Sequence, residues 1–213
     1  MKLYTYFRSS AAYRVRIALN LKGVSHEAMP VDLRPGAHRQ PDYLARNPQG
    51  LVPALEDGGA VIAQSLAIIE YLEETHPSPP LLPRAPLDRA RVRSLALAVA
   101  CDIHPLNNLR VLNYLRSPLG HDQATVDAWY RHWIAEGFRA LEEEAKRSGD
   151  GRHMCGGEVT LADICLVPQM FNARRFKCDV EPFPALRAIC AHLETLPAFA
   201  RAAPDGQPDA CSR

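Results

Sequence analysis

The sequence lacks most of the features that mark metal-binding, membrane or nucleic-acid-binding proteins. It has six cysteines but no C-x-x-C pair and no cysteine–histidine spacing typical of ligands, so we expect no metal site. The formal net charge is only +1 over 213 residues, which gives no reason to expect nucleic acid or an anionic membrane as a partner. No apolar run approaches the length of a membrane span, so we expect no membrane-spanning helix.

The cysteines and the first residues bear on the cellular compartment. The cysteines are scattered over the second half of the chain, which favours reduced, mostly buried thiols over a disulfide framework. The N-terminus begins with a strand pattern instead of a basic region followed by an apolar block, so we expect no signal peptide. Together these observations predict a cytoplasmic protein.

What the sequence does contain is a change of pattern near residue 78. Before it the expected order is strand, helix, strand, short helix, hairpin and helix, which is typical of a compact α/β unit. A proline-rich segment follows, and beyond it long helices occur with almost no strand signal. We therefore predict an α/β domain at 1–78, a linker at 79–86 and an all-helical domain at 87–213.

Periodicity and capping signals predict the elements of the helical part. Thr160 and Asp163 form a capping box at the start of one helix. A proline should interrupt the first long helix, because it has no N–H to donate. The helices are expected at 87–115, with the interruption at Pro105, and at 123–147, 160–174, 184–196 and 197–203, with a loose tail after Pro204.

The residues around Ser9 and Ser10 are the first candidate functional feature. The β-forming run at 2–7 ends at a charge and these two serines, and a helix then runs to Gly23. The two hydroxyls therefore lie beside free N–H groups and the positive end of a helix dipole. Such a place stabilises a phosphate, a carboxylate or a thiolate. Taken alone, helix capping is the simpler explanation of the serines.

Two further motifs, Val52-Pro53 and Gln64-Ser65, flank a predicted hairpin with its turn at Asp57-Gly58-Gly59. A proline at the start of a strand removes one hydrogen-bond donor from the sheet, which is tolerated only where the strand begins. After the hairpin, Ser65 is suited to be the N-cap of a helix that Pro77 ends.

These motifs occur together in glutathione transferases, and the chain resembles the zeta class of that family. The run Ser9–Leu19 closely resembles the S-S-x-x-x-R-V-R-I-A-L signature of the class, and Gln64–Glu74 resembles its second signature. The Thr160–Asp163 motif and residues 166–169 and 172–176 match the C-terminal domain. The resemblance covers essentially the whole chain. It implies a thioredoxin-like N-terminal domain followed by an all-helical C-terminal domain.

The resemblance also implies an activity, a cofactor and a homodimer. Zeta-class proteins are typically maleylacetoacetate isomerases, and a close bacterial branch isomerises maleylpyruvate. Both substrates are dicarboxylate keto acids with a cis double bond, which rotates only after a thiolate has added to one of its carbons. Glutathione supplies that thiolate and is regenerated by elimination. General glutathione conjugation or dehalogenation, and a fold used only for binding, stay open as alternatives.

The resemblance places the thiolate at the two serines. Ser9 is the first candidate donor and Ser10 the second, since a hydroxyl and a helix N-terminus both favour the thiolate over the thiol. Ala11 occupies the position where the family often has a cysteine, so no protein thiol is expected there. Val52, next to a proline that the fold holds cis, is expected to pair with the glutathione backbone.

The remaining candidates follow from charge and position. Gln64 and Ser65 are expected to bind the γ-glutamyl carboxylate, and His38 or Gln40 to reach the glycyl end. For His104, three roles stay open: it binds a carboxylate, it binds the cofactor of a neighbouring subunit, or it only packs against other side chains. The full set expected to contact glutathione is Ser9, Ser10, Ala11, His38, Val52, Gln64, Ser65, His104, Asn108 and Arg110.

Arginines are expected near the thiolate, because the substrate is a dianion and guanidinium binds carboxylates in bidentate fashion. Arg8, Arg110 and Arg175 are the candidates. Arg14 and Arg16 are expected to be structural, pairing on their own helix or at a dimer interface.

Overall fold

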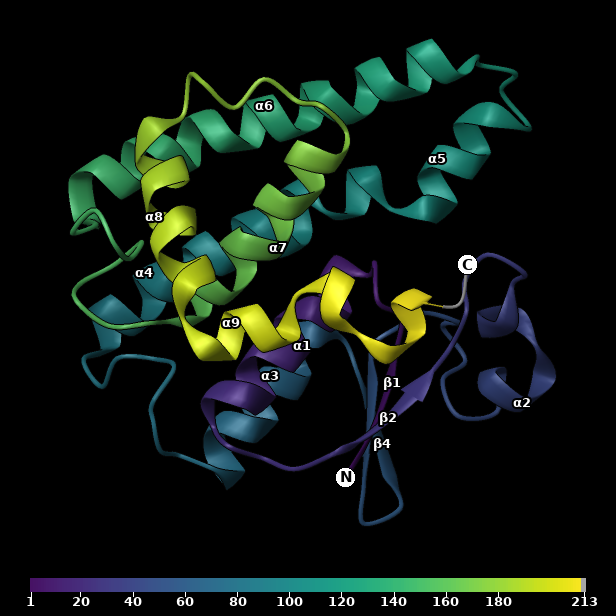
Figure 1. Ribbon diagram of the computed structural model, residues 1–213, viewed down its shortest axis with the longest axis horizontal. Coiled ribbons are helices and arrows are strands. Elements are labelled where there is room, and N and C mark those ends of the chain that lie inside the picture. The colour runs from purple at the N-terminus through teal and green to yellow at the C-terminus, as the bar shows by residue number, and fades with distance from the viewer. Residues whose placement is uncertain (212–213) are drawn as a thin grey trace. The chain divides into compact units, whose positions relative to one another are not determined.

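The computed structural model describes residues 1–211, and its contacts divide the chain into two compact units. The first unit comprises residues 1–80 and the segment that begins at Thr195, so it carries both the purple and the yellow ends of the ribbon in Figure 1. The second unit comprises residues 81–194. The domain boundaries predicted at residues 78 and 86 stay predictions.

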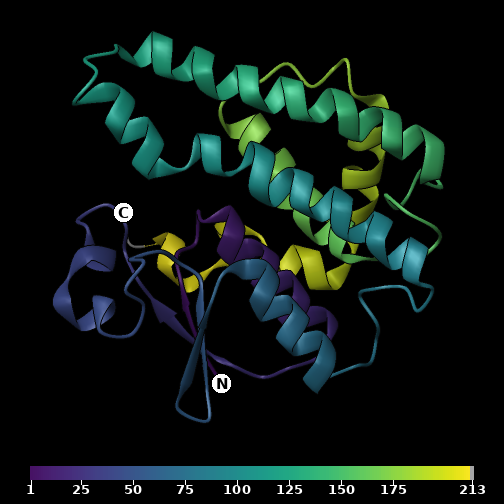
Figure 2. The ribbon, with the colours of Figure 1, turned by 180° about the vertical axis from the view of Figure 1, so that it is seen from behind.

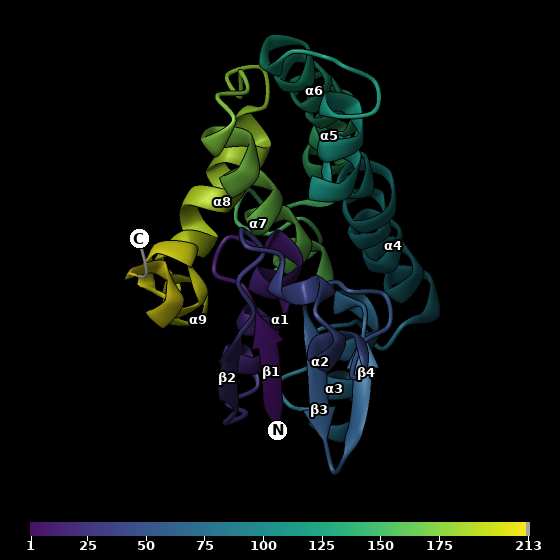
Figure 3. The same cartoon turned by 90° about the vertical axis from the view of Figure 1, so that its right-hand side faces the viewer.

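The first unit is built on a mixed sheet with the strand order β2-β1-β3-β4. β1 pairs in parallel with β2 and antiparallel with β3, and β3 pairs antiparallel with β4 across the predicted hairpin turn, as Figure 3 shows. This topology confirms the predicted thioredoxin-like fold. The elements are β1 Lys2–Thr5, α1 Ser10–Leu21, β2 Glu27–Pro30, η1 Ala37–Arg39, α2 Pro41–Leu44, β3 Ala54–Asp57, β4 Ala60–Ala63, α3 Ser65–Thr75, α9 Pro197–Ala202, η4 Pro204–Gly206 and η5 Pro208–Cys211.

Helix α1 packs against both α3 and α9, and a buried lysine fixes its end. The Lys22 ammonium donates to Glu73 Oε2 at 2.7 Å and to the carbonyls of His76 and Pro79 at 2.7 and 3.0 Å. All three of its donors are therefore used, which compensates the cost of burying the charge. These bonds join the end of α1 to the end of α3 and to the segment that follows it.

The second unit is entirely helical in its described residues, as predicted for this part of the chain. Figure 2 shows α5 running alongside the long helix α6. None of its helices, nor any other described helix, combines the length and the apolar character needed to cross a membrane. The elements are α4 Pro86–Leu97, the π-helical segment η2 Ala98–Ile103, η3 Pro105–Asn107, α5 Leu109–Arg116, α6 Gln123–Ser148, α7 Leu161–Arg175 and α8 Pro184–Thr195.

The first long helix of this unit is interrupted at Pro105 as predicted, but the interruption is longer than one residue. The helix widens into a π turn before the proline, with the His104 N–H bonded to Val99 C=O at 2.9 Å. A 3-10 turn follows before α5 begins. Such π turns are uncommon and are often found at functional sites.

The predicted capping box at the start of α7 is confirmed. The fully buried Asp163 carboxylate accepts hydrogen bonds from Thr160 N and Oγ1 at 2.8 and 2.9 Å, and from Met154 N at 2.8 Å. Burial raises the pKa of Asp163, while these hydrogen bonds act in the opposite direction. The carboxylate therefore serves the fold, as the sequence indicates.

Gly137 of α6 allows the π turn to lie close against this helix. A Cβ at residue 137 would overlap Cγ1 and Cδ1 of Ile103, whose side chain is buried. Alanine in a helix interior normally stabilises by about 1 kcal/mol relative to glycine. At this position the overlap should reverse that sign.

We expect Gly137→Ala to lower the free energy of unfolding by about 1–3 kcal/mol, because overpacking forces side chains off their rotamers. Denaturant unfolding measures the effect. Gly157→Ala is the matched control, since the nearest heavy atom to a Cβ there is 4.0 Å away. Adding Ile103→Ala to the Gly137 variant should recover part of the loss, and a Gly137→Ala protein more stable than wild type would contradict the packing argument.

Candidate functional site

Three segments singled out in the sequence meet at one edge of the sheet. The register pairs Tyr4 of β1 with Ala54 of β3, and Ala54 with Ala63 of β4. The chain therefore leaves β1, enters β3 and leaves β4 at the same edge. The turn leading into α1, the Val52-Pro53 pair and the Gln64-Ser65 pair lie directly beyond these three points.

Ser9 is the N-cap of α1. Its backbone is extended, and its Oγ accepts a hydrogen bond from Ala12 N–H at 3.2 Å. Capping uses a lone pair of the hydroxyl and leaves its O–H hydrogen available to an anion. Ser9 is partly exposed, whereas Ser10, the first residue of α1, is only 5% exposed. This exposure favours Ser9 over Ser10 as a donor to a ligand.

Ala11 and Arg8 flank the two serines. Ala11 lies in the first turn of α1, where the backbone N–H groups have no carbonyl of the helix to bind. Arg8 is exposed, and its guanidinium carbon lies 4.9 Å from the centre of the Phe7 ring. This cation–π contact leaves the guanidinium open to solvent and so to a carboxylate.

Val52 precedes a cis peptide bond to Pro53, as the family resemblance implies. The loop before it is fixed by the Tyr43 hydroxyl and by Asn47 Nδ2, which donate to Leu51 C=O at 2.6 and 2.7 Å. In the part of the chain that the structure describes, neither the N–H nor the C=O of Val52 has a hydrogen-bond partner. Both groups are therefore available to an extended peptide.

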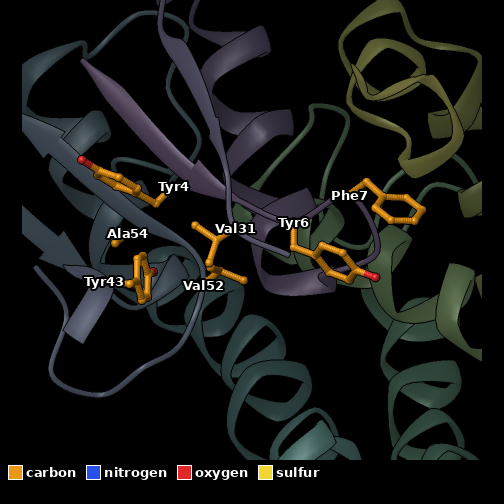
Figure 4. Close-up of a cluster of buried hydrophobic side chains, with 7 residues drawn as sticks. All are labelled: Tyr4, Tyr6, Phe7, Val31, Tyr43, Val52 and Ala54. Atoms are coloured by element: carbon orange, nitrogen blue, oxygen red, sulfur yellow. The ribbon is translucent and has the colours of Figure 1, made fainter. Parts of the chain in front are cut away.

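A buried cluster of side chains supports this edge of the sheet (Figure 4). Two edge-to-face ring pairs lie in it, Tyr4 with Tyr43 at 5.9 Å and Tyr6 with Phe7 at 4.9 Å between centroids. Because the cluster joins β1, the turn after it and the start of β3, it fixes these segments relative to one another. Its members are Tyr4, Tyr6, Phe7, Val31, Tyr43, Val52 and Ala54.

Gln64 has a backbone conformation that is rare outside glycine, with φ 73° and ψ 120°. It is the N-cap of α3, since its carbonyl accepts the Ile68 N–H at 3.0 Å. The prediction of Ser65 as the N-cap is therefore wrong by one residue. The unusual φ of Gln64 turns the chain sharply at the end of β4, so the helix begins at Ser65. The Gln64 side chain donates to Gln49 Oε1 at 2.8 Å.

Arg14 places a positive charge beside the start of α3. Its guanidinium is 1% exposed, and Nη1 donates to Ser65 Oγ at 3.3 Å. This contact joins two helices of one unit, whereas the sequence analysis expects Arg14 to pair on its own helix or at a dimer interface. A buried cation and a helix N-terminus together favour an anion at this point.

His38 lies in the short turn η1, with its Nδ1 buried and without a hydrogen-bond partner among the described residues. Burial lowers the pKa of His38, and the neighbouring Arg39 lowers it further. The ring is therefore neutral near pH 7. Among the described residues, its side chain forms no hydrogen bond with the polar groups at the sheet edge.

In the second unit, side chains of α6 and η3 fix the segment between the π turn and α5. Trp129 Nε1 donates to Leu106 C=O at 2.9 Å, and Asn107 Nδ2 donates to Tyr130 C=O at 3.3 Å. These two bonds run in opposite directions between the same elements. They hold the predicted ligand residues on either side of η3 in place.

His104, Asn108 and Arg110 lie on this fixed segment. His104 is half-buried at the end of the π turn, and Asn108 is the N-cap of α5, with its Oδ1 accepting Arg110 N–H at 3.1 Å. Capping occupies the amide oxygen of Asn108 and leaves its NH₂ group as the donor. The Arg110 side chain is exposed and forms no hydrogen bond or ion pair within the described chain.

Arg175 is the last residue of α7, and its guanidinium carbon lies 4.8 Å from the centre of the Phe176 ring. Phe176 in turn stacks on Tyr130, with 3.6 Å between ring centres. The adjacent Arg174 is occupied by an ion pair with Glu194 at 2.6 Å. Of the two arginines, Arg175 is therefore the one oriented by aromatic rings.

Sequence reasoning missed two contributors to the first unit. The sequence predicts a loose tail that includes Asp209, but this residue lies in η5, and its Oδ2 accepts the Phe7 N–H at 2.9 Å. Arg16, expected to pair on its helix or at an interface, binds the turn before Ser9 and the carbonyl of Ala202. The one signal for this role is that Arg16 lies among the apolar positions of α1 that are expected to be buried. No local signal marks Asp209.

The fold and this site define a class of protein, and family comparisons agree with it. Models of the N-terminal and the C-terminal domain of glutathione S-transferases match residues 3–80 and 111–197. The chain belongs to the glutathione S-transferase family.

Its relatives include two named isomerases. A maleylpyruvate isomerase from a Ralstonia species is 51% identical over 213 residues, which cover 98% of this chain and 99% of that protein. A probable maleylacetoacetate isomerase from Vibrio cholerae is 50% identical over 211 residues, 98% of each chain.

Solved structures agree. The holo structure of a maleylpyruvate isomerase, a bacterial zeta-class glutathione S-transferase, has a TM-score of 0.97 at 50% identity, covering 99% of this chain and 100% of that one. A maleylacetoacetate isomerase from Methylobacterium extorquens AM1, with bound malonate and GSH, has a TM-score of 0.95 at 44% identity, covering 99% of each chain. The predicted membership of the zeta class is confirmed.

The conformation of Gln64 leads to a stability prediction. A non-glycine residue in such a region costs about 1–3 kcal/mol, and glycine loses about 0.5–1 kcal/mol through the unfolded chain. We expect Gln64→Gly to raise the free energy of unfolding by about 0.5–2 kcal/mol in denaturant titrations. Gln64→Ala removes the same side-chain amide but keeps the Cβ, so it should give no gain. Equal stabilities for the two variants would show that the backbone is not strained.

Proposed function

We propose that the protein is a glutathione-dependent cis–trans isomerase that converts maleylacetoacetate to fumarylacetoacetate. The observation that carries the proposal is the partly exposed Ser9 hydroxyl, whose lone pair is used by Ala12 N–H and whose O–H hydrogen is available at the start of a helix. Relatives with about half of their residues identical carry this activity in their names. The Methylobacterium enzyme binds both GSH and a small dicarboxylate.

The sheet edge fits a γ-glutamyl tripeptide. The N–H and C=O of Val52, which have no partner among the described residues, are the groups that an extended peptide backbone requires. Ser65, the N-terminus of α3 and the charge of Arg14 suit the γ-glutamyl carboxylate. Gln64 adds a side-chain amide at the same place, and Ser9 lies at the end of β1 on the same edge.

When bound, glutathione supplies a thiolate that adds to one alkene carbon. The double bond thereby becomes a single bond that can rotate, and elimination of the thiolate then restores the double bond in the trans form. The chain's own task is to keep the thiol ionised near neutral pH. Lowering a thiol pKa by one unit requires about 1.4 kcal/mol. The N-terminus of α1 contributes roughly 0.3–1 kcal/mol and a hydrogen bond to a charged acceptor about 1.5–3 kcal/mol. Ser9 and the N-terminus of α1 together are therefore sufficient to lower the pKa of the thiol by at least one unit.

For the substrate carboxylates we assign Arg8, Arg110 and Arg175. All three arginines are exposed, and the guanidinium groups of Arg8 and Arg175 are oriented by contacts with phenylalanine rings. Planar guanidinium groups bind a carboxylate with two parallel hydrogen bonds, which fixes its orientation.

Maleylpyruvate is the alternative substrate, favoured by the 51% identity to the Ralstonia enzyme and by the TM-score of 0.97 to a maleylpyruvate isomerase. Both substrates carry a carboxylate at each end, so charge does not separate them. We keep maleylacetoacetate first because the double serine of the N-terminal signature favours it. We also propose that the protein acts as a homodimer in the cytoplasm.

The direct test supplies maleylacetone or maleylpyruvate with and without glutathione and follows loss of the cis isomer. We expect turnover that depends on glutathione and returns it unconsumed. The ratio of kcat/KM for the two substrates decides between them. Conjugation that consumes glutathione would replace the isomerase proposal with a transferase, and binding of glutathione without turnover of either compound would leave a binding protein.

Replacing Ser9 by alanine separates its two roles. We expect Ser9→Ala to raise the pKa of the bound thiol and to lower kcat at neutral pH by about tenfold or more, since a hydrogen bond to an anion is lost. Stability should fall by only about 1 kcal/mol through the lost cap. Ser9→Thr keeps the hydroxyl and should retain most activity. Ser10→Ala is the matched comparison, and if it alone loses activity, Ser10 and not Ser9 is the donor.

A further inference from the structure

The turn between β1 and α1 is held by a residue from the other end of the chain. Phe7 N–H donates to Asp209 Oδ2 at 2.9 Å, across 202 positions of sequence. Asp209 lies in η5, and its neighbour Ala210 packs against the buried cluster that contains Tyr6 and Phe7. The last described turn of the chain therefore contacts the residues that immediately precede Arg8 and Ser9.

Arg16 holds the same turn from the inside of the first unit. Its guanidinium is 3% exposed, and it donates to Thr5 Oγ1 and to Phe7 C=O, each at 3.0 Å. It also donates to Ala202 C=O of α9 at 3.0 Å and, more weakly, to Tyr6 C=O at 3.4 Å. One side chain thereby joins β1, the turn and the C-terminal helix.

Arg16 and Asp209 carry opposite charges close to the same turn. Burial lowers the pKa of Arg16 to about 10, and the Asp209 carboxylate acts in the opposite direction. The guanidinium is therefore charged at neutral pH, with Asp209 as a compensating anion. Removing the Asp209 carboxylate takes away the hydrogen bond to the turn. It also leaves the buried charge of Arg16 without this compensating anion.

These contacts leave the turn little freedom. Tyr6 C=O accepts the Ser9 N–H at 2.9 Å, so the position of Ser9 follows from that of Tyr6 and Phe7. The Phe7 N–H is held by Asp209 and the Phe7 C=O by Arg16. Both polar groups of the Phe7 backbone are thus fixed by side chains, one of which is 9 and the other 202 positions away in the sequence.

We propose that Asp209 is a positioning residue for the reaction: its hydrogen bond to Phe7 N–H fixes the turn so that the Ser9 hydroxyl is directed at the thiol of glutathione. This inference rests on the proposed function, because the thiol is that of the proposed cofactor. A misplacement of about 1 Å is enough to cost a reaction a large factor in rate. Asp209 itself contacts neither thiol nor substrate in this role.

Three variants test the proposal. Asp209→Ala removes the acceptor, Asp209→Asn keeps an acceptor oxygen but removes the charge, and Asp205→Ala is the matched control. Asp205 is exposed in the same C-terminal segment and makes no side-chain hydrogen bond or ion pair in the described chain. The measurements are the pKa of the bound thiol from thiolate ultraviolet absorbance, the pH profile of kcat, KM, and hydrogen exchange at the Phe7 amide.

We expect Asp209→Ala to raise the pKa of the bound thiol and to lower kcat about fivefold to tenfold at neutral pH, with KM little changed. The loss should shrink as pH rises, because the thiolate then forms without help. The Phe7 amide should exchange faster. Asp209→Asn should recover most of the rate, and Asp205→Ala should match wild type.

The outcomes separate the inference from the proposed function. A wild-type thiol pKa and pH profile in Asp209→Ala, in a protein that otherwise turns over, would overturn the positioning role alone. So would an equal effect of Asp205→Ala, or an Asp209→Ala protein that loses stability and rate equally at every pH. If the wild-type protein binds no glutathione, the proposed function fails and this inference fails with it.

Discussion

The free N–H groups at the start of α1 are the constraint on which the site depends. A helix cannot satisfy its first N–H groups by itself, so they require acceptors from elsewhere. Ser9 supplies one acceptor to Ala12 and keeps a hydrogen to donate in turn. The rest of the helix end presents partial positive charge to whatever lies beyond it. Capping and anion binding are therefore two uses of a single feature.

The sheet register turns this feature into a two-point site. Both α1 and α3 begin at the edge where Tyr4, Ala54 and Ala63 are paired. Two helix N-termini of the same unit thus lie at this edge. The backbone of Val52, which has no hydrogen-bond partner in the described part of the chain, lies there as well. A γ-glutamyl tripeptide has a thiol, a peptide backbone and a carboxylate to match them. The order of the strands, and not any single side chain, sets this correspondence.

Local chemistry made much of this predictable from the sequence. The α/β and all-helical parts, the serine pair at a helix start, the hairpin turn and the Thr160–Asp163 capping box all depend on nearby residues, whereas the thioredoxin-like fold is implied by the family resemblance. The N-cap of α3 was misplaced, because the backbone conformation of Gln64 is not visible in its side-chain type. The π turn at 98–103 was missed because its apolar spacing resembles an ordinary helix.

Contacts between distant parts of the chain were the ones that sequence could not supply. A short tail rich in proline and aspartate predicts a loose segment. In the structure, however, Asp209 binds the Phe7 N–H and Ala210 packs against the cluster that contains Phe7. Arg14 is a buried cation that binds Ser65, 51 positions away, and the buried Arg16 binds Ala202, 186 positions away, as well as the turn before Ser9. Such pairings depend on how whole elements pack, which no local pattern records.

The first unit is discontinuous in the sequence, since it needs both residues 1–80 and the segment that begins at Thr195. During synthesis the N-terminal strands and α1 leave the ribosome long before α9 and η5 exist. Until then, Arg16 has no Ala202 carbonyl to bind and the Phe7 amide has no Asp209. The turn that carries Ser9 therefore acquires these two contacts only after the C-terminal segment has joined the first unit.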